Sequence, residues 1–196
     1  MKNVMTKKEH GNMQIELFLP GGRARKDAVI IEKLPHGPNI ITIVMGTEDT
    51  TDCDALITES GAFPLGIKTA DCAPICFTDG KKIGIAHIGW RGLCDGLVEK
   101  MLGNFDAKML SVYVAPFLHS FEIKKDECYD RITQKFGERF ITNEEGKLTF
   151  HFKKAISSLL PPQAEYDPRG TGTDFAFPSY RRDKTSERFV TLVSFR

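Results

Sequence analysis

Two of the five histidines and one of the five cysteines in this sequence of 196 residues lie in segments that can bring metal-binding side chains together. Cys72 lies in the segment Thr-Ala-Asp-Cys-Ala-Pro-Ile (69–75), and His87 lies in Ala-His-Ile-Gly-Trp-Arg-Gly (86–92). His36 lies in Leu-Pro-His-Gly-Pro (34–38), a constrained loop that can reach the same point. Two imidazoles and one thiolate suit Zn²⁺, and three protein ligands leave a fourth position for water or substrate. These residue types predict a catalytic metal site at His36, Cys72 and His87.

The spacing alone leaves other interpretations open, because the sequence contains no CxxC or HExxH motif. His87 shares strand parity with Ile83 and Ile85, so it is also a candidate for a hydrogen-bonded core histidine. Cys72 is also a candidate for a small buried hydrophobe, which is the common fate of a free cysteine. A metal-free alternative makes Cys72 a thiolate nucleophile and His87 its base, for hydrolysis of an amide or ester.

A predicted hairpin would bring Cys72 and His87 together. Residues 75–78 and 83–88 have the character of strands, and Asp79-Gly80 between them is typical of a primed hairpin turn. Cys72 then precedes one strand and His87 closes the other, so the two meet although they are fifteen positions apart.

The rest of the chain alternates short strands with a few helices. Residues 28–34 fit either a helix or a strand. This alternation predicts a mixed α/β domain rather than a pure barrel or bundle. Strands are predicted over 13–19, 40–44, 55–58, 65–68, 109–114 and 189–195, and helices over 92–104, 127–136 and 152–160.

The composition is that of an ordinary globular protein, with 41% hydrophobic and 27% charged residues and a net charge of +1. The absence of a basic stripe argues against nucleic acid as a partner, and the longest apolar run, 40–45, is too short to span a membrane. Residues 1–10 lack the apolar segment of a signal peptide. Five irregularly spaced cysteines do not indicate a disulfide framework. We expect a single cytoplasmic domain over 1–196, with Cys53, Cys76, Cys94 and Cys128 in packing roles.

The two central motifs resemble the signature of the YfiH-like laccase-domain family, also called the multicopper polyphenol oxidase-like or peptidoglycan editing factor family. Further resemblances follow in the same order over roughly residues 35 to 195. They are Pro35-His36-Gly37, Asp54-Ala55-Leu56-Ile57-Thr58, Ala115-Pro116 with Phe121-Glu122-Ile123, and Ser179-Tyr180-Arg181-Arg182 with Arg188-Phe189.

The resemblance implies an α/β/β/α four-layer sandwich with a zinc site formed by His36, Cys72 and His87. It implies purine nucleoside phosphorylase activity, with adenosine deaminase activity as a related possibility, and a purine nucleoside and phosphate as the ligands. An older family assignment is copper-dependent oxidation of polyphenols, and some members are linked to the editing of peptidoglycan precursors. Copper is therefore the alternative metal.

The sequence departs from the family pattern around the expected pocket. The N-terminal region is short, and the family's Arg-x-Gly-Gly-Val-Ser element is missing or reduced to Pro-Gly-Gly-Arg (20–23). Leu34-Pro35 replaces the glutamine before His36, and Phe117 or Leu118 replaces a cysteine. These departures concern the wall of the substrate pocket more than the metal ligands.

Phosphorolysis requires cations that hold phosphate, and Arg91, Arg181 and Arg182 are the candidates because guanidinium binds phosphate through two parallel hydrogen bonds. Without the resemblance, Tyr-Arg-Arg (180–182) would be interpreted as a solvated strand end.

An aromatic side chain would stack on the base, and Trp90, Phe177 and Tyr180 are the candidates. Deamination would need a proton shuttle, for which Asp71 is the nearest acid; a turn-capping carboxylate is the alternative role of Asp71.

Two further functions remain open at this stage. A zinc-stabilised module could bind a nucleotide or cell-wall precursor without turning it over, with Cys76 or His119 completing the metal shell. Copper could bind at the single site, but five histidines, with His10, His119 and His151 outside the motif, are too few for multicopper chemistry.

Overall fold

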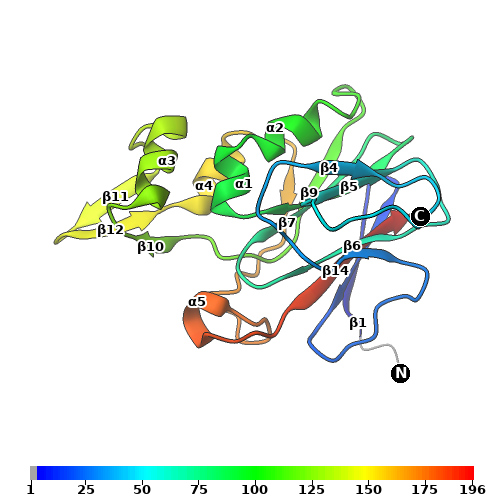
Figure 1. Cartoon of the computed structure of the whole chain (residues 1–196), viewed down its shortest axis with the longest axis horizontal. Coiled ribbons are helices and arrows are strands. Elements are labelled where there is room, and N and C mark those ends of the chain that lie inside the picture. Colours follow the sequence, from blue (N-terminus) through cyan, green and yellow to red (C-terminus); the bar gives the residue numbers. More distant parts are fainter. Residues whose placement is uncertain (1–3) are drawn as a thin grey trace.

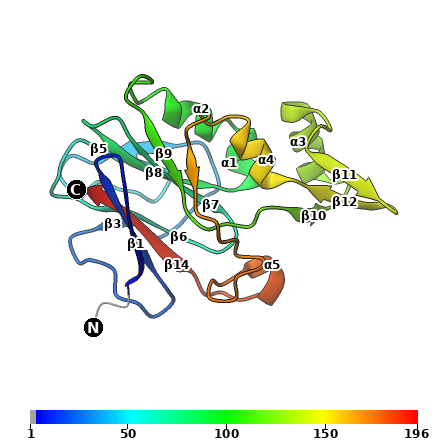
Figure 2. The same cartoon turned by 180° about the vertical axis from the view of Figure 1, so that it is seen from behind.

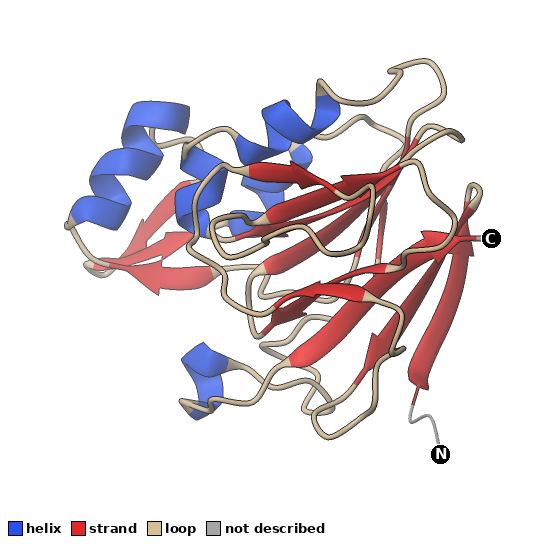
Figure 3. Cartoon of the chain, turned by 45° about the vertical axis from the view of Figure 1, so that its right-hand side comes forward, coloured by secondary structure: helices blue, strands red, loops and turns tan. Residues whose placement is uncertain are grey.

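Two β-sheets pack face to face, and helices cover the outer face of one of them (Figures 1 and 3). This computed structural model describes residues 4–196. The first sheet has five strands in the order β1-β2-β14-β6-β3. Its strands are β1 (Val4–His10), β2 (Met13–Phe18), β3 (Val29–Ile31), β6 (Leu65–Thr69) and β14 (Phe189–Phe195).

The second sheet has six strands in the order β13-β9-β7-β8-β5-β4. The predicted hairpin is present: β7 and β8 are antiparallel, and Pro74 pairs with His87. The Asp79 N–H donates to the Lys82 carbonyl. The two turn residues are therefore Gly80 and Lys81, one position later than the predicted Asp79 and Gly80. The strands are β4 (Ile40–Thr42), β5 (Ala55–Thr58), β7 (Ala73–Thr78), β8 (Ile83–Ile88), β9 (Ser111–Val114) and β13 (Glu165–Tyr166).

The space between the two sheets is filled by alternate residues of their facing strands. Met13, Ile15 and Leu17 of β2 share this core with Ile83 and Ile85 of β8. Each side chain is at most 2% exposed, and burial of an aliphatic side chain contributes about 1.5–3 kcal/mol. This core sets the two sheets against each other and so places the strand ends that carry the candidate residues.

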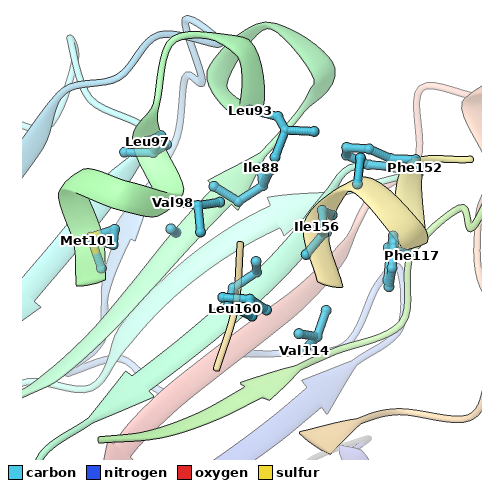
Figure 4. Packing of buried hydrophobic residues seen from close by; sticks show 14 of the residues in the cluster. Ile88, Leu93, Leu97, Val98, Met101, Val114, Phe117, Phe152, Ile156 and Leu160 are labelled. Atoms are coloured by element: carbon cyan, nitrogen blue, oxygen red, sulfur yellow. The ribbon is translucent and has the colours of Figure 1, made fainter. Parts of the chain in front are cut away.

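Three short helices cover the outer face of the six-stranded sheet: α1 (Trp90–Cys94), α2 (Leu97–Leu102) and α4 (Phe152–Ser157) (Figure 4). The prediction of one continuous helix over 92–104 is wrong. Gly96 adopts a left-handed conformation with φ 81°, which ends α1 and lets α2 begin in a new direction. Leu93 lies in α1 and Leu97 lies in α2, and both side chains pack in the same hydrophobic cluster.

A smaller lobe projects from the helical side (Figure 2). It consists of the sheet β10-β12-β11 and helix α3 (Glu127–Phe136), which has the predicted bounds. The side chain of Asp126 caps α3 by accepting the Cys128 N–H. The strands are β10 (Phe121–Ile123), β11 (Ile141–Glu144) and β12 (Lys147–Phe150).

The C-terminal segment before β14 forms a one-turn helix, α5 (Tyr180–Asp183). The bare residues would favour a solvated strand end there; the strand is wrong, but Tyr180 and Arg181 are exposed. The Ser179 side chain accepts the Arg182 N–H and thereby starts the helical turn. Residues 28–34, which fitted either element, contain the strand β3.

The mixed α/β fold is confirmed.

A small hydrophobic cluster lies on the outer face of the five-stranded sheet. Within residues 4–196, it is covered by the loop before β3 and by β3 itself. Its buried members are Phe18, Val190 and Leu192, and Ala24, Ala28 and Ile30 pack against them. No helix in the described range is long and apolar enough to cross a membrane.

Candidate active site

The structure brings the three predicted metal ligands to one point. One ligand atom from each of His36, Cys72 and His87 lies within 4.8 Å of the other two. His36 comes from the loop between β3 and β4, Cys72 from the turn before β7, and His87 from the end of β8. The pairing of Ala73 with Ile88 across the hairpin accounts for the approach of Cys72 to His87.

Asp54, the residue before β5, is hydrogen-bonded to both histidines. Its carboxylate is fully buried and accepts three hydrogen bonds. Oδ1 accepts the His36 N–H at 3.0 Å, Oδ2 accepts the Gly37 N–H at 2.7 Å, and Nδ1 of His87 lies 2.7 Å from Oδ1. A carboxylate accepts from Nδ1–H, so this arrangement leaves Nε2 of His87 as the ligand atom.

The electrostatics of the cluster favour the charged forms of Cys72 and His87. Burial alone would raise the pKa of the Cys72 thiol, but the imidazoles of His87 and His36 lower that pKa to about 6. Burial alone would lower the pKa of His87, but the Cys72 thiolate and the Asp54 carboxylate raise it to about 9. The thiolate is the form of cysteine that acts as a metal ligand or nucleophile.

Gly89, which follows β8, allows the three ligands to approach one another. A Cβ at this position would lie 3.2 Å from Cδ2 of His36, 3.3 Å from Sγ of Cys72 and 3.8 Å from Cε1 of His87. The backbone of Gly89 has φ −90° and ψ 172°, a conformation open to any residue. The glycine is therefore needed for space rather than for backbone freedom.

We expect Gly89→Ala to weaken metal binding by at least about tenfold while the protein stays folded, because the methyl group pushes apart side chains that must converge. Competition with a chelating dye measures the affinity. Gly103→Ala is the matched control, since its Cβ would meet only backbone oxygens at 3.6 Å. Equal affinities of the two variants would show that the three side chains do not bind a common ion.

Asp71 connects the Cys72 turn to two distant segments. Its φ of 83° is unusual for a residue other than glycine and carries a strain of about 1–3 kcal/mol, which surrounding contacts must offset. Oδ1 accepts from the Thr171 hydroxyl at 2.8 Å, and Oδ2 accepts from the Arg181 N–H at 2.7 Å. The Asp71 carbonyl accepts the Leu118 N–H. Both carboxylate oxygens thus have partners, an arrangement suited to positioning Cys72.

A cavity of about 740 Å³ opens above the three ligands and is lined by most of the predicted substrate-binding residues. Trp90, Arg91, Tyr180 and Arg181 line it together with His36, Cys72 and His87. Tyr180 is 53% exposed, so its ring is available for stacking. The Arg91 guanidinium lies 4.3 Å from the Trp90 ring centre and 3.4 Å from Glu127, and it retains free N–H groups.

Arg182 and Phe177 do not line this cavity. Arg182 donates to the carbonyls of Thr171 and Phe177 and to the Asp183 carboxylate, so its guanidinium holds the C-terminal segment together. Phe177 is 1% exposed and packs on Phe189 in the core between the sheets. The structure therefore favours Arg91 over Arg182 as a phosphate ligand.

The other cysteines and His119 lie apart from the three ligands. Cys76 is fully buried between the sheets, where burial raises the pKa of its thiol. His119 packs its ring on Phe117 and does not line the cavity. Within residues 4–196, the group of metal-binding side chains contains neither Cys76 nor His119. All three clustered side chains line the cavity, so a molecule in the cavity can reach them.

Neither Asp54 nor Gly89 was predicted as a site residue from the sequence. Asp54 precedes a fully buried strand and belongs to a segment that carries the family resemblance, and a carboxylate at such a buried position requires partners. Gly89 lies within the second motif. The missing information was which donors would surround each residue.

Residues 10–196 match the family model described as multi-copper polyphenol oxidoreductase laccase. A relative from Aquifex aeolicus, named purine nucleoside phosphorylase, is 29% identical over 201 aligned residues that cover 95% of this chain and 94% of the relative. The Escherichia coli protein named purine nucleoside phosphorylase YfiH is 26% identical and covers 90% of this chain and 77% of its own.

Two solved structures share the fold. The structure of Neisseria meningitidis protein NMB0706 superposes with a TM-score of 0.83 at 19% identity and covers 99% of both chains. That of Bacillus licheniformis YfiH superposes with a TM-score of 0.73 at 21% identity and covers 87% of this chain and 74% of its own.

Proposed function

The chain belongs to the multi-copper polyphenol oxidoreductase laccase family, and we propose that it is a zinc-dependent purine nucleoside phosphorylase. The observation that carries this proposal is the convergence of His36, Cys72 and His87 at the floor of a cavity that Arg91 and Tyr180 also line. The names of the Aquifex and Escherichia coli relatives support the same reaction.

The residues present fit zinc. Two imidazole nitrogens and one thiolate are zinc ligands, Asp54 orients one imidazole as carboxylates commonly do for metal-bound histidines, and Gly89 leaves the space that convergence needs. A zinc ion at this point would supply a Lewis acid on the cavity floor. Multicopper oxidation has less support, because residues 4–196 contain one group of clustered metal-binding side chains rather than several.

The chain's own residues would bind and orient the two reactants. In phosphorolysis a phosphate oxygen forms a bond to C1′ of the ribose and the C1′–N9 bond breaks. The electron pair of the broken bond leaves with the purine, which takes up a proton. Arg91 would hold the phosphate through its free N–H groups, and Arg181, at the same wall, would add positive charge. Tyr180 would stack on the purine.

Adenosine deamination has less support from this geometry. It would need an acid that exchanges a proton near the floor, and both oxygens of Asp71 already accept hydrogen bonds from Thr171 and Arg181. A positioning role for Asp71 accounts for the same residue without that step.

A metal-free cysteine hydrolase is the second candidate function, and one observation favours it. Cys72, His87 and Asp54 have the order of nucleophile, base and orienting carboxylate, with Nδ1 of His87 2.7 Å from Asp54. One thiolate does not serve as zinc ligand and nucleophile together, so metal content separates the two functions.

We expect the purified protein to release adenine from adenosine, or hypoxanthine from inosine, only when inorganic phosphate is present. Chromatography of the free base and of ribose 1-phosphate measures the reaction. An Arg91→Ala variant should raise KM for phosphate by about tenfold, because it loses a charge-assisted contact. Arg139→Ala removes an exposed cation outside the cavity and is the control. Base release that does not depend on phosphate would overturn phosphorolysis.

A further inference from the structure

The mouth of the cavity carries more positive charge than inorganic phosphate and a neutral nucleoside require. Six cationic side chains and two carboxylates line it, an excess of four positive charges in a chain whose net charge is +1. The cations are Lys33, Lys68, Arg91, Arg181, Lys184 and Arg188, and the carboxylates are Glu32 and Asp71.

Both carboxylates already have partners. Glu32 lies 2.5 Å from the Lys68 ammonium, and Asp71 accepts from Thr171 and from the Arg181 N–H. Neither is therefore free to neutralise the remaining cations. Within residues 4–196, Lys33, Lys184 and Arg188 form no ion pair, although Lys184 lies 5.4 Å from the Tyr180 ring centre and Arg188 donates to two backbone carbonyls.

Two of these cations flank the end of β6. In the strand order β14-β6-β3, the last pair between β3 and β6 is Ile31 with Ile67, and Lys33 follows two residues after the end of β3. On the other side Phe189 pairs with Thr69, and Arg188 directly precedes it. The sheet register thus brings Lys33 and Arg188 to the same strand end although they are far apart in sequence.

Thr69 is the last residue of β6, the strand between β3 and β14, and it has an unused hydroxyl. Its side chain is 2% exposed and lines the cavity, and its Oγ1 has no hydrogen-bond partner among the described residues. A buried polar atom without a partner carries a cost that a ligand oxygen would relieve. Lys33 and Arg188, which have no carboxylate partner among the described residues, line the same cavity as this hydroxyl, and the three groups are of the kind that binds an oxyanion. None of the three belongs to α1, which carries Arg91.

We propose that the substrate is a phosphorylated nucleoside, a purine nucleoside monophosphate, whose own phosphate binds at Lys33, Arg188 and Thr69. This inference rests on the proposed function. A phosphate monoester carries a charge of about −1.5 to −2 near neutral pH, so inorganic phosphate alone offsets roughly half of the excess. A second phosphate on the substrate offsets the rest.

The reaction balances with the second phosphate as a spectator. Inorganic phosphate forms a bond to C1′, the C1′–N9 bond breaks, and the purine leaves with the electron pair and takes up a proton. With adenosine 5′-monophosphate the products are adenine and ribose 1,5-bisphosphate. The subsite contributes binding energy and orientation rather than chemistry.

The test compares adenosine 5′-monophosphate with adenosine in the full-length, zinc-loaded protein. We expect kcat/KM for the monophosphate to exceed that for adenosine by at least about tenfold, from its extra charge-assisted contacts. Calorimetric titration without inorganic phosphate should show the same preference in binding. The double variant Lys33→Ala/Arg188→Ala should remove most of the preference in both measurements. The values for adenosine 5′-monophosphate should fall, while those for adenosine should change little. Lys81→Ala/Lys108→Ala removes two exposed cations outside the cavity and is the charge-matched control.

The outcomes separate this inference from the proposed function. Phosphate-dependent cleavage of adenosine, with equal or weaker binding of the monophosphate, would overturn the subsite and keep the phosphorylase. No cleavage of either compound, with tighter binding of the monophosphate that the Lys33/Arg188 variant abolishes, would support the subsite and overturn the phosphorylase. An equal loss of the preference in the control variant would also overturn the subsite, because a general charge effect would then explain it.

Discussion

Cys72→Ala is expected to bind zinc at least about a hundredfold more weakly than the unaltered protein and to lose phosphate-dependent base release. The substitution removes one of three ligands, and the two remaining imidazoles hold zinc poorly without the thiolate. Elemental analysis of protein purified without added metal measures the effect. We expect about one zinc ion per unaltered chain and a small fraction of that in the variant.

Cys76→Ala provides the matched control, because it makes the same chemical change four residues later in the chain, within β7. Cys76 is buried between the sheets, so its loss should lower the free energy of unfolding by about 1 kcal/mol and leave the zinc content unchanged. Full zinc retention in Cys72→Ala would refute the proposed site. Metal-free native protein whose hydrolysis of an amide or ester stops on alkylation of Cys72 would instead establish the cysteine hydrolase.

Asp54→Asn should weaken zinc binding by about 10- to 100-fold, the usual range for a residue that orients a metal-bound histidine. The amide has the same size as the carboxylate, but its NH₂ group is a donor. Both oxygens of Asp54 accept from N–H groups, so in the variant one donor faces another donor. Asp54 serves the backbone of His36 and Gly37 and the ring of His87, so both histidines lose their support. Competition with a chelator gives the affinity, and thermal unfolding should show a loss of about 1–3 kcal/mol.

Asp167→Asn controls for the burial of a carboxylate. Asp167 is 3% exposed and accepts from Tyr113 and Arg169, away from the cavity. Its replacement should destabilise the fold by a similar amount with no change in zinc affinity. Similar zinc losses in both variants would mean that Asp54 acts through stability alone, and the proposed orientation of His87 would be wrong.

Local sequence patterns were sufficient for the elements next to the site. The β7–β8 hairpin follows from two apolar segments and a glycine-containing turn only a few residues long, so it depends on neighbours in sequence. Helix α3 was predicted correctly because the pattern of its apolar positions, including Ile132 and Phe136, is helical. Both elements are determined within a short stretch of chain.

The errors arose where packing decides the backbone. Leu93, Leu97 and Leu102 fit one helical stripe, yet the chain breaks at Gly96, whose left-handed conformation lets α1 and α2 each cover part of the sheet. Helix α5 is a single turn held by Ser179 and by the bond from the Arg181 N–H to Asp71. A turn this short has no periodicity to detect.

The donor groups, and the β7–β8 hairpin that brings Cys72 to His87, could be predicted from the residues alone, because side-chain chemistry and short-range strand pairing depend on neighbours in sequence. The surroundings of these two residues depend on how distant segments pack. The Asp54 contacts with His36 and His87, the bond from Thr171 to Asp71, and the pairing of β6 with both β3 and β14 join residues distant in sequence. Such contacts form when the two sheets pack and a strand gains its neighbours, and no local pattern specifies which neighbour a strand end will meet.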